Sequence, residues 1–118
     1  MAKLSEERLA DEPFSCAAEP RGEDVVVTIR GELDLATRDE AEAVLLDAEE
    51  IATRAVVIDL RDLRFLGSTG LSILVASAGR ATLRGIGQEI IPSEGVRRLF
   101  AMTGVDRHLT TREDLPDH

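Results

Sequence analysis

Residues 55–78, AVVIDLRDLRFLGSTGLSILVASA, decide how this chain folds. The first six, 55–60, are β-branched or apolar almost throughout, which is typical of a strand buried on both faces of a parallel sheet. A polar turn follows, and apolar side chains then recur at helical spacing at Leu71, Leu74, Val75 and Ala78. The stretch therefore predicts a central strand joined to a helix that ends near Gly85.

Two shorter apolar runs precede this stretch. Residues 14–18 and 25–31 both favour strands, and the polar residues 19–24 between them favour a turn. We therefore expect an antiparallel hairpin at the start of the domain. Residues 1–12 show no clear period and are expected to form a flexible or weakly ordered tail.

A helix is predicted between the hairpin and the central strand. Apolar residues recur there on one face, at Ala41, Val44, Leu45, Ala48, Ile51 and Ala52. Thr37 and Glu40 have the spacing of a capping box, in which a hydroxyl and a carboxylate satisfy amide donors at a helix start. The pattern predicts a helix over residues 38–53.

The C-terminal third of the chain again shows a strand pattern and a helix pattern, each of them shorter than before. Residues 88–91 predict a short strand, and Pro92-Ser93 has the composition of a helix start. An apolar stripe follows and ends before Gly104. Residues 105–112 have room for one more short element, and residues 113–118 are expected to be a tail.

The order of these segments predicts the fold class. A strand that returns through a helix to the next strand pairs parallel with it by a right-handed crossover. We therefore expect one α/β domain over residues 13–112, a length that suits a single core. Its small mixed sheet has about four strands, an antiparallel N-terminal hairpin followed by parallel strand-helix-strand units, and is covered by helices.

Charge narrows the choice of partner. The 118 residues carry 14 Lys and Arg against 23 Asp and Glu, a net charge of −9. Residues 1–50 carry a net −10, whereas residues 51–118 carry +1. Nucleic acid is a poor partner for such a surface, because its phosphates are bound by Lys and Arg. A protein with a basic face is the better expectation.

Other classes are disfavoured by what the sequence lacks. No apolar run approaches the roughly 20 residues of a membrane-spanning helix, and the first residues lack an apolar signal region, so we expect a cytoplasmic protein without a membrane partner. One cysteine, Cys16, and two histidines do not supply a standard structural zinc site. We expect Cys16 to serve as a small buried hydrophobic residue, with a redox sensor as the weaker alternative.

The polar turn between the central strand and its helix is the candidate site. Ligands of open sheets collect beyond the carboxyl ends of parallel strands, and this turn places Ser68 and Thr69 there at a helix start. The plainer interpretation makes both residues helix caps, with Gly67 and Gly70 permitting a tight entry.

Enzyme motifs are incomplete at this turn. A nucleotide-phosphate loop requires a lysine after its glycine, but the only lysine of the chain is Lys3. A hydrolase nucleophile elbow requires glycine two residues before the serine, where this chain has Leu66. A magnesium ion held by Asp34, Asp59 and Asp62 stays a weaker alternative, because acidic residues at strand ends more often form turns.

Three segments of the chain resemble a known family. Residues 56–71, VVIDLRDLRFLGSTGL, preceded by residues 31–34, GELD, look like the STAS domain of bacterial anti-sigma factor antagonists. Residues 96–105, VRRLFAMTGV, are similar to the closing helix of that family. The resemblance covers about residues 14–112 and implies a STAS-like fold.

The resemblance implies a regulatory binding protein rather than an enzyme. Family members bind an anti-sigma factor that is also a serine kinase, and this binding releases a sigma factor. The kinase inactivates its antagonist on a serine that corresponds to Ser68, and a metal-dependent serine phosphatase reverses the reaction. The implied partner surface consists of Asp34, Gly67, Ser68, Thr69 and Gly70, with no metal and no cofactor, since ATP belongs to the kinase.

One residue departs from the family pattern and keeps an alternative open. The family commonly has aspartate immediately before the phosphorylated serine, whereas this chain has Gly67. The alternative function is a phosphorylation-independent STAS module, a subunit of a transporter or of a larger signalling complex. A third hypothesis, a small phosphotransfer or nucleotide-binding enzyme at residues 59–70, is disfavoured by the missing lysine.

Overall fold

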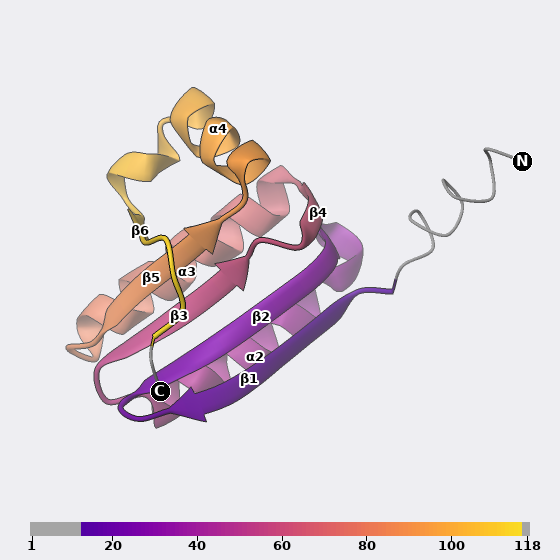
Figure 1. Cartoon of the computed structure of the whole chain (residues 1–118). Coiled ribbons are helices and arrows are strands. Elements are labelled where there is room, and N and C mark those ends of the chain that lie inside the picture. The colour runs from indigo at the N-terminus through magenta and orange to yellow at the C-terminus, as the bar shows by residue number, and fades with distance from the viewer. Residues whose placement is uncertain (1–12, 117–118) are drawn as a thin grey trace, which may run out of the picture.

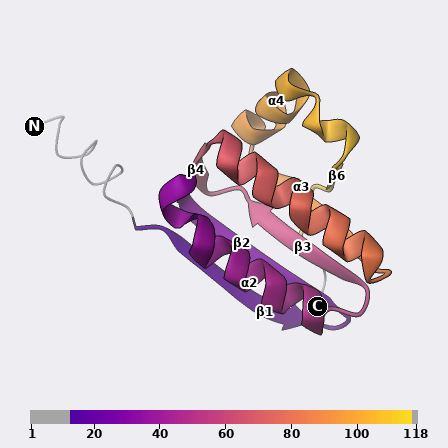
Figure 2. The same cartoon turned by 180° about the vertical axis from the view of Figure 1, so that it is seen from behind.

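A mixed sheet organises residues 13–116, the part of the chain that the computed structural model describes. Helices α2 and α3 cover one face of the sheet, and α4 lies beyond its edge (Figures 1 and 2). The strands are β1 (Ser15–Arg21), β2 (Asp24–Leu33), β3 (Ala55–Leu60), β4 (Leu63–Leu66), β5 (Gly87–Pro92) and β6 (Thr110–Thr111). The helices are α2 (Arg38–Ile51), α3 (Ser68–Leu83) and α4 (Glu94–Thr103), with 3-10 turns at Leu35–Thr37 and Val105–Arg107.

The sheet topology confirms the predicted fold class. The hairpin β1–β2 is antiparallel, and β2–β3, β3–β5 and β5–β6 are parallel, in the order β1-β2-β3-β5-β6. Strand β3 is central and all six of its residues are buried, as its composition predicted. The sheet has six strands rather than about four. The additional β4 and β6 have four and two residues, too few for a period in the sequence to reveal them.

The hairpin turn is tighter than predicted. Strand β1 continues through Pro20 to Arg21, and the turn is confined to Gly22 and Glu23. Proline is tolerated at this position because β1 is an edge strand, where a missing N–H donor need not interrupt pairing with a second strand. Gly22 has φ +63°, a conformation that glycine adopts at little cost.

The capping box predicted at Thr37 and Glu40 is wrong. The Thr37 hydroxyl instead accepts the Asp34 N–H at 3.1 Å and donates to the Glu32 carbonyl at 2.8 Å. The Asp34 carboxylate accepts the Ala36 N–H at 3.0 Å. These bonds close a 3-10 turn between β2 and α2, so the end of β2 and the position of Asp34 are fixed together.

A buried ionic cluster holds α3 against α2. Glu49 is 2 % exposed, and Arg80 donates to its carboxylate through Nε at 2.7 Å and Nη2 at 3.0 Å. The Ser77 hydroxyl donates to the same carboxylate at 2.6 Å. Such a cluster tolerates little sliding, because any displacement leaves a buried charge without its partners. The position of α3, which carries the candidate site, is therefore tied to α2.

The opposite face of the sheet carries a small apolar cluster. Val26, Val57 and Ile91 lie together there, and Leu115 packs against them. Figure 1 shows the C-terminal segment crossing this face. Arg21 donates to the Pro116 carbonyl at 3.4 Å, so part of the segment expected to be a tail, 113–118, is docked on the sheet. The expected N-terminal tail, 1–12, lies outside the described residues.

Among residues 13–116, none of the helices is both long and apolar enough to cross a membrane.

Candidate functional site

Ser68 lies where β2 and β4 end side by side. It is the first residue of α3 and is exposed, and Gly67 precedes it as the N-cap with φ −89° and ψ 179°. The Gly67 N–H donates to the Leu33 carbonyl at 3.0 Å, which ties the entry of α3 to the end of β2. Strand β4 enters this position because it pairs parallel with β2, Leu66 opposite Leu33. The hydroxyl is therefore accessible on a rigid support.

Gly70 lets the first turn of α3 lie directly on the strand ends. A Cβ at this position would be 2.6 Å from the Leu66 Cδ1 and 2.8 Å from the Leu33 carbonyl oxygen. The residue itself is buried. Its contribution to the site is thus spacing rather than direct contact with a partner.

Thr69 lies on the side of the site that adjoins α2. It is half-buried and lines a pocket of about 330 Å³ between α2 and α3. Arg38 and Glu42 of α2 line the same pocket with Ser72. Of the five residues expected at the partner surface, Ser68 is thus the exposed one, Asp34, Gly67 and Thr69 are partly accessible, and Gly70 lies beneath them.

Two exposed apolar side chains, which were not expected from the sequence, lie on the segments that surround Gly67. Leu35 is 71 % exposed and Phe65 is 51 % exposed. A Cβ added to Gly67 would be 3.2 Å from the Phe65 ring and 3.7 Å from the Asp34 Cβ, so Phe65 and Asp34 border Gly67. Leu35 follows Asp34 in the chain. We call Asp34, Leu35, Phe65, Gly67 and Ser68 the docking rim. Large apolar side chains gathered on a surface are typical of protein contacts.

The sequence held a weak signal for these two side chains. The chain has three phenylalanines, and one of them stands three residues before the candidate serine. Leu35 falls between a strand and a helix and belongs to the apolar period of neither. An apolar residue that no element requires is a reason to examine that position as a surface contact.

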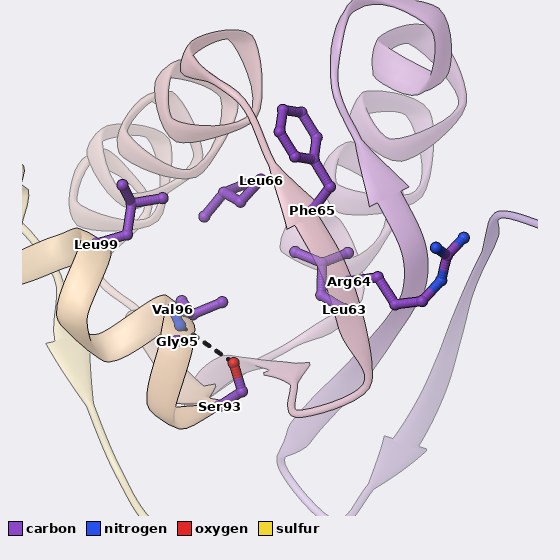
Figure 3. A pocket seen from close by; sticks show the side chains of 8 residues that line it. All are labelled: Leu63, Arg64, Phe65, Leu66, Ser93, Gly95, Val96 and Leu99. Carbon is purple, nitrogen blue, oxygen red and sulfur yellow. Dashed lines mark hydrogen bonds between the residues drawn. The ribbon is translucent and has the colours of Figure 1, made fainter. Parts of the chain in front are cut away.

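A groove opens beside the docking rim, between β4 and α4 (Figure 3). Its volume is about 300 Å³. Phe65 lies at its border, so the groove and the rim share one side chain. The lining consists of Leu63, Arg64, Phe65, Leu66, Ser93, Gly95, Val96 and Leu99.

The acidic residues considered for magnesium do not gather. Burial alone would raise the pKa of Asp59, but the side-chain and backbone hydrogen bonds from Arg61 outweigh it and hold this pKa below its usual value. Asp62 pairs instead with Arg30 at 3.5 Å, and Asp34 caps the 3-10 turn. Within the described part of the chain, three or more metal-ligating side chains do not come together anywhere.

Cys16 is partly buried in β1 and packs against the main core. Burial, with a smaller contribution from the negative charge of Glu40, raises the pKa of this thiol to about 12. The thiol therefore stays protonated at neutral pH and is a poor nucleophile.

Comparison with known proteins agrees with the fold. The sequence model of the STAS domain matches residues 15–118. The chain belongs to the STAS-domain family. The matched range includes β1 through β6, and with them the docking rim and the groove.

Several relatives of this STAS domain, both curated and solved, are anti-sigma factor antagonists. The anti-sigma-B factor antagonist of Staphylococcus aureus is 32 % identical over 85 residues, which is 67 % of this chain and 74 % of that protein. An anti-sigma factor antagonist from Mycobacterium paratuberculosis is 26 % identical, with a TM-score of 0.75 over 89 % of this chain and 90 % of the other. The Bacillus cell fate determinant SpoIIAA in its phosphorylated form shares the fold, with a TM-score of 0.61, 20 % identity and coverage of 86 % and 93 %.

The close approach at Gly70 makes a prediction about stability. In Gly70→Ala, the methyl group must displace a backbone carbonyl, so we expect the free energy of unfolding to fall by about 1–3 kcal/mol. Urea denaturation measures this change. Gly79→Ala is the matched control, because Gly79 lies in the same helix with open space around its Cβ position, and alanine there adds up to about 1 kcal/mol. Equal stability of Gly70→Ala and the parent chain would contradict the constraint.

Proposed function

We propose that this STAS domain is an anti-sigma factor antagonist that binds an anti-sigma factor with serine kinase activity and so releases a sigma factor. The observation that carries the proposal is the exposed Ser68 hydroxyl at the start of a rigid helix, on a rim that also exposes the apolar side chains of Leu35 and Phe65. A partner that covers these side chains buries apolar surface and brings its catalytic site to the hydroxyl. The names of the relatives support the same function.

Phosphorylation of Ser68 is the proposed off switch. A phosphate carries about −1.5 to −2 charge at neutral pH, and here it would lie beside the free amides and the positive dipole end of α3. The helix therefore has no reason to unfold. The phosphorylated form of SpoIIAA, which shares this fold, is consistent with a modification that leaves the architecture in place.

The switch then acts at the contact itself. An interface that covers Leu35 and Phe65 is poor in water, and a charge buried there without a partner is costly. The neutral hydroxyl carries no such penalty. A serine phosphatase restores the binding form by removing the charge, and the exposure of Ser68 gives it access.

The acidic surface has a separate role in this proposal. Asp39 and Glu40 are exposed in the first turn of α2, directly after the 3-10 turn that Asp34 begins. Their field attracts a basic partner from a distance and raises the rate of encounter. The phosphate acts over contact distance, at an apolar position, so the two effects of negative charge do not conflict.

Substitutions at Ser68 test the switch. We expect Ser68→Ala to bind the serine-kinase anti-sigma factor of the same organism within about threefold of the parent chain, but to accept no phosphate. Ser68→Glu should weaken binding at least about tenfold, or about 1.4 kcal/mol, because the carboxylate loses water at the contact. Calorimetry measures the Kd, and intact-mass measurement after incubation with ATP counts the phosphates.

A charge placed elsewhere on α3 is the control for Ser68→Glu. Thr82 is exposed in the last turn, 14 residues from Ser68 and so about 20 Å along the helix. Thr82→Glu should bind like the parent chain. Equal affinity of Ser68→Ala, Ser68→Glu and the parent chain would show that this position does not control the complex.

Gly67 favours one alternative, a STAS module that binds without being phosphorylated. The backbone of Gly67 is extended, so any residue can adopt it, and an added Cβ meets the half-exposed Phe65 ring, which is able to turn aside. The chain therefore accommodates the aspartate that the family commonly has here. Nothing in the fold requires glycine at this position.

Gly67→Asp separates the two functions. If the kinase recognises a carboxylate beside its target, Gly67→Asp should speed phosphorylation of Ser68 about fivefold, the gain from one charged contact of about 1 kcal/mol. Gly67→Ala controls for the added Cβ and should leave the rate unchanged. Initial rates of phosphate incorporation measure the effect. Binding of the anti-sigma factor with no phosphate on the parent chain or on Gly67→Asp would favour the phosphorylation-independent module.

A further inference from the structure

The groove between β4 and α4 has an apolar floor. Leu63, Leu66 and Val96 form it and are each at least nine-tenths buried. Leu99 of α4 is partly buried at one side, and Phe65 borders the other. Figure 3 shows the side chains of Leu66, Val96 and Leu99 facing the space between the two elements. A cavity of about 300 Å³ with such walls favours an apolar occupant.

The lining has two polar side chains, and each of them has a partner within the protein. The Ser93 hydroxyl accepts the Val96 N–H at 3.1 Å as the N-cap of α4. Arg64 points away from the groove in Figure 3 and lies 3.8 Å from the Glu32 carboxylate. Recognition of a nucleotide or another charged ligand requires polar groups whose hydrogen bonds or charges are available to that ligand. The chemistry of the lining thus favours a hydrocarbon or aromatic group.

The groove is continuous with the docking rim. Phe65 belongs to both, and its ring lies against Gly67, the residue before Ser68. A protein that covers the rim therefore also covers the mouth of the groove. Its volume suits one large side chain rather than a whole helix, which is the usual form of an anchor residue at an interface.

We propose that this groove is the anchor pocket for the anti-sigma factor and receives one large aliphatic or aromatic side chain of that protein. The inference rests on the proposed function and adds the chemistry by which the partner is recognised. The pocket supplies affinity, whereas Ser68 supplies the switch. Loss of the anchor should weaken the complex about 10- to 100-fold, as expected for one large apolar side chain.

Gly95 offers a way to fill the pocket without disturbing the core. It lines the groove as the second residue of α4, and an added Cβ would meet only the Ser93 Oγ, at 4.0 Å. Gly95→Leu should fold normally, because leucine is a better helix residue than glycine, and should block the mouth. Gly95→Ala adds one carbon and should leave the groove open.

The test measures the Kd of Gly95→Ala and Gly95→Leu for the serine-kinase anti-sigma factor. We expect Ala to bind within about twofold of the parent chain and Leu at least about tenfold more weakly. Gly79→Leu is the matched control, with the same change on the exposed side of α3, and should bind like the parent chain. In the parent complex, the methyl NMR signals of Leu63, Leu66 and Leu99 should shift.

The outcomes separate this inference from the proposed function. Normal binding by Gly95→Leu, together with unshifted methyl signals and a weakened Ser68→Glu, overturns the anchor pocket and leaves the antagonist intact. Failure of the parent chain to bind the anti-sigma factor overturns both. Weakened binding by Gly95→Leu but not by Gly79→Leu, with shifted methyl signals, supports the pocket.

Discussion

The close contact between the first turn of α3 and the ends of β2 and β4 determines the geometry of the whole site. At Gly70 there is no room for a side chain, since a Cβ would lie 2.8 Å from the Leu33 carbonyl oxygen. The Gly67 N–H, bonded to that same carbonyl at 3.0 Å, fixes the preceding residue. One backbone oxygen thus sets both the depth and the direction at which the helix leaves the sheet. Ser68 lies between these two fixed glycines and is therefore held at the surface.

On this rigid support, the docking rim combines two separate physical effects, apolar contact and a change of charge at Ser68. In the proposed function, apolar contact at Leu35 and Phe65 supplies affinity in proportion to the area removed from water and does not depend on charge state. The Ser68 hydroxyl contributes little affinity there and is the group whose charge the proposed kinase changes. A switch of this kind needs no conformational change. The buried Glu49–Arg80 pair resists one, because it ties the helix that carries Ser68 to its neighbour.

Local pattern predicted most of the fold, and failed where long-range pairing decides. The buried strand 55–60 and the helices after residues 37, 67 and 93 have strong periods, and each is present. Strand β4 was missed because it depends on pairing with the end of β2, beyond the irregularity between Gly31 and Glu32. Thr37 was assigned to the wrong cap because its hydroxyl has two nearby uses, and the course of β2 selects the Glu32 carbonyl.

Sequence patterns predicted where the candidate site lies in the chain, but not which side chains are exposed around it. The sequence placed Ser68 correctly at a helix start, whereas which neighbours are exposed follows from packing that no local pattern encodes. Gly70 was expected at the partner surface and is buried, whereas Phe65, to which no role was assigned, belongs to both the rim and the groove lining. Residues 113–116 showed no period, because a single side chain, Leu115, docks them.

Hydrogen–deuterium exchange with and without the serine-kinase anti-sigma factor tests most directly whether the docking rim is the binding surface. The amides of residues 68–70 lie in the first turn of α3, where N–H groups lack intrahelical acceptors, so they should exchange quickly in the free chain. We expect the partner to slow exchange at residues 33–38 and 65–71 and to leave β1 and residues 110–116 unchanged. Slowed exchange at β1 and residues 110–116, with no slowing at the docking rim, would show that the rim is not the binding surface.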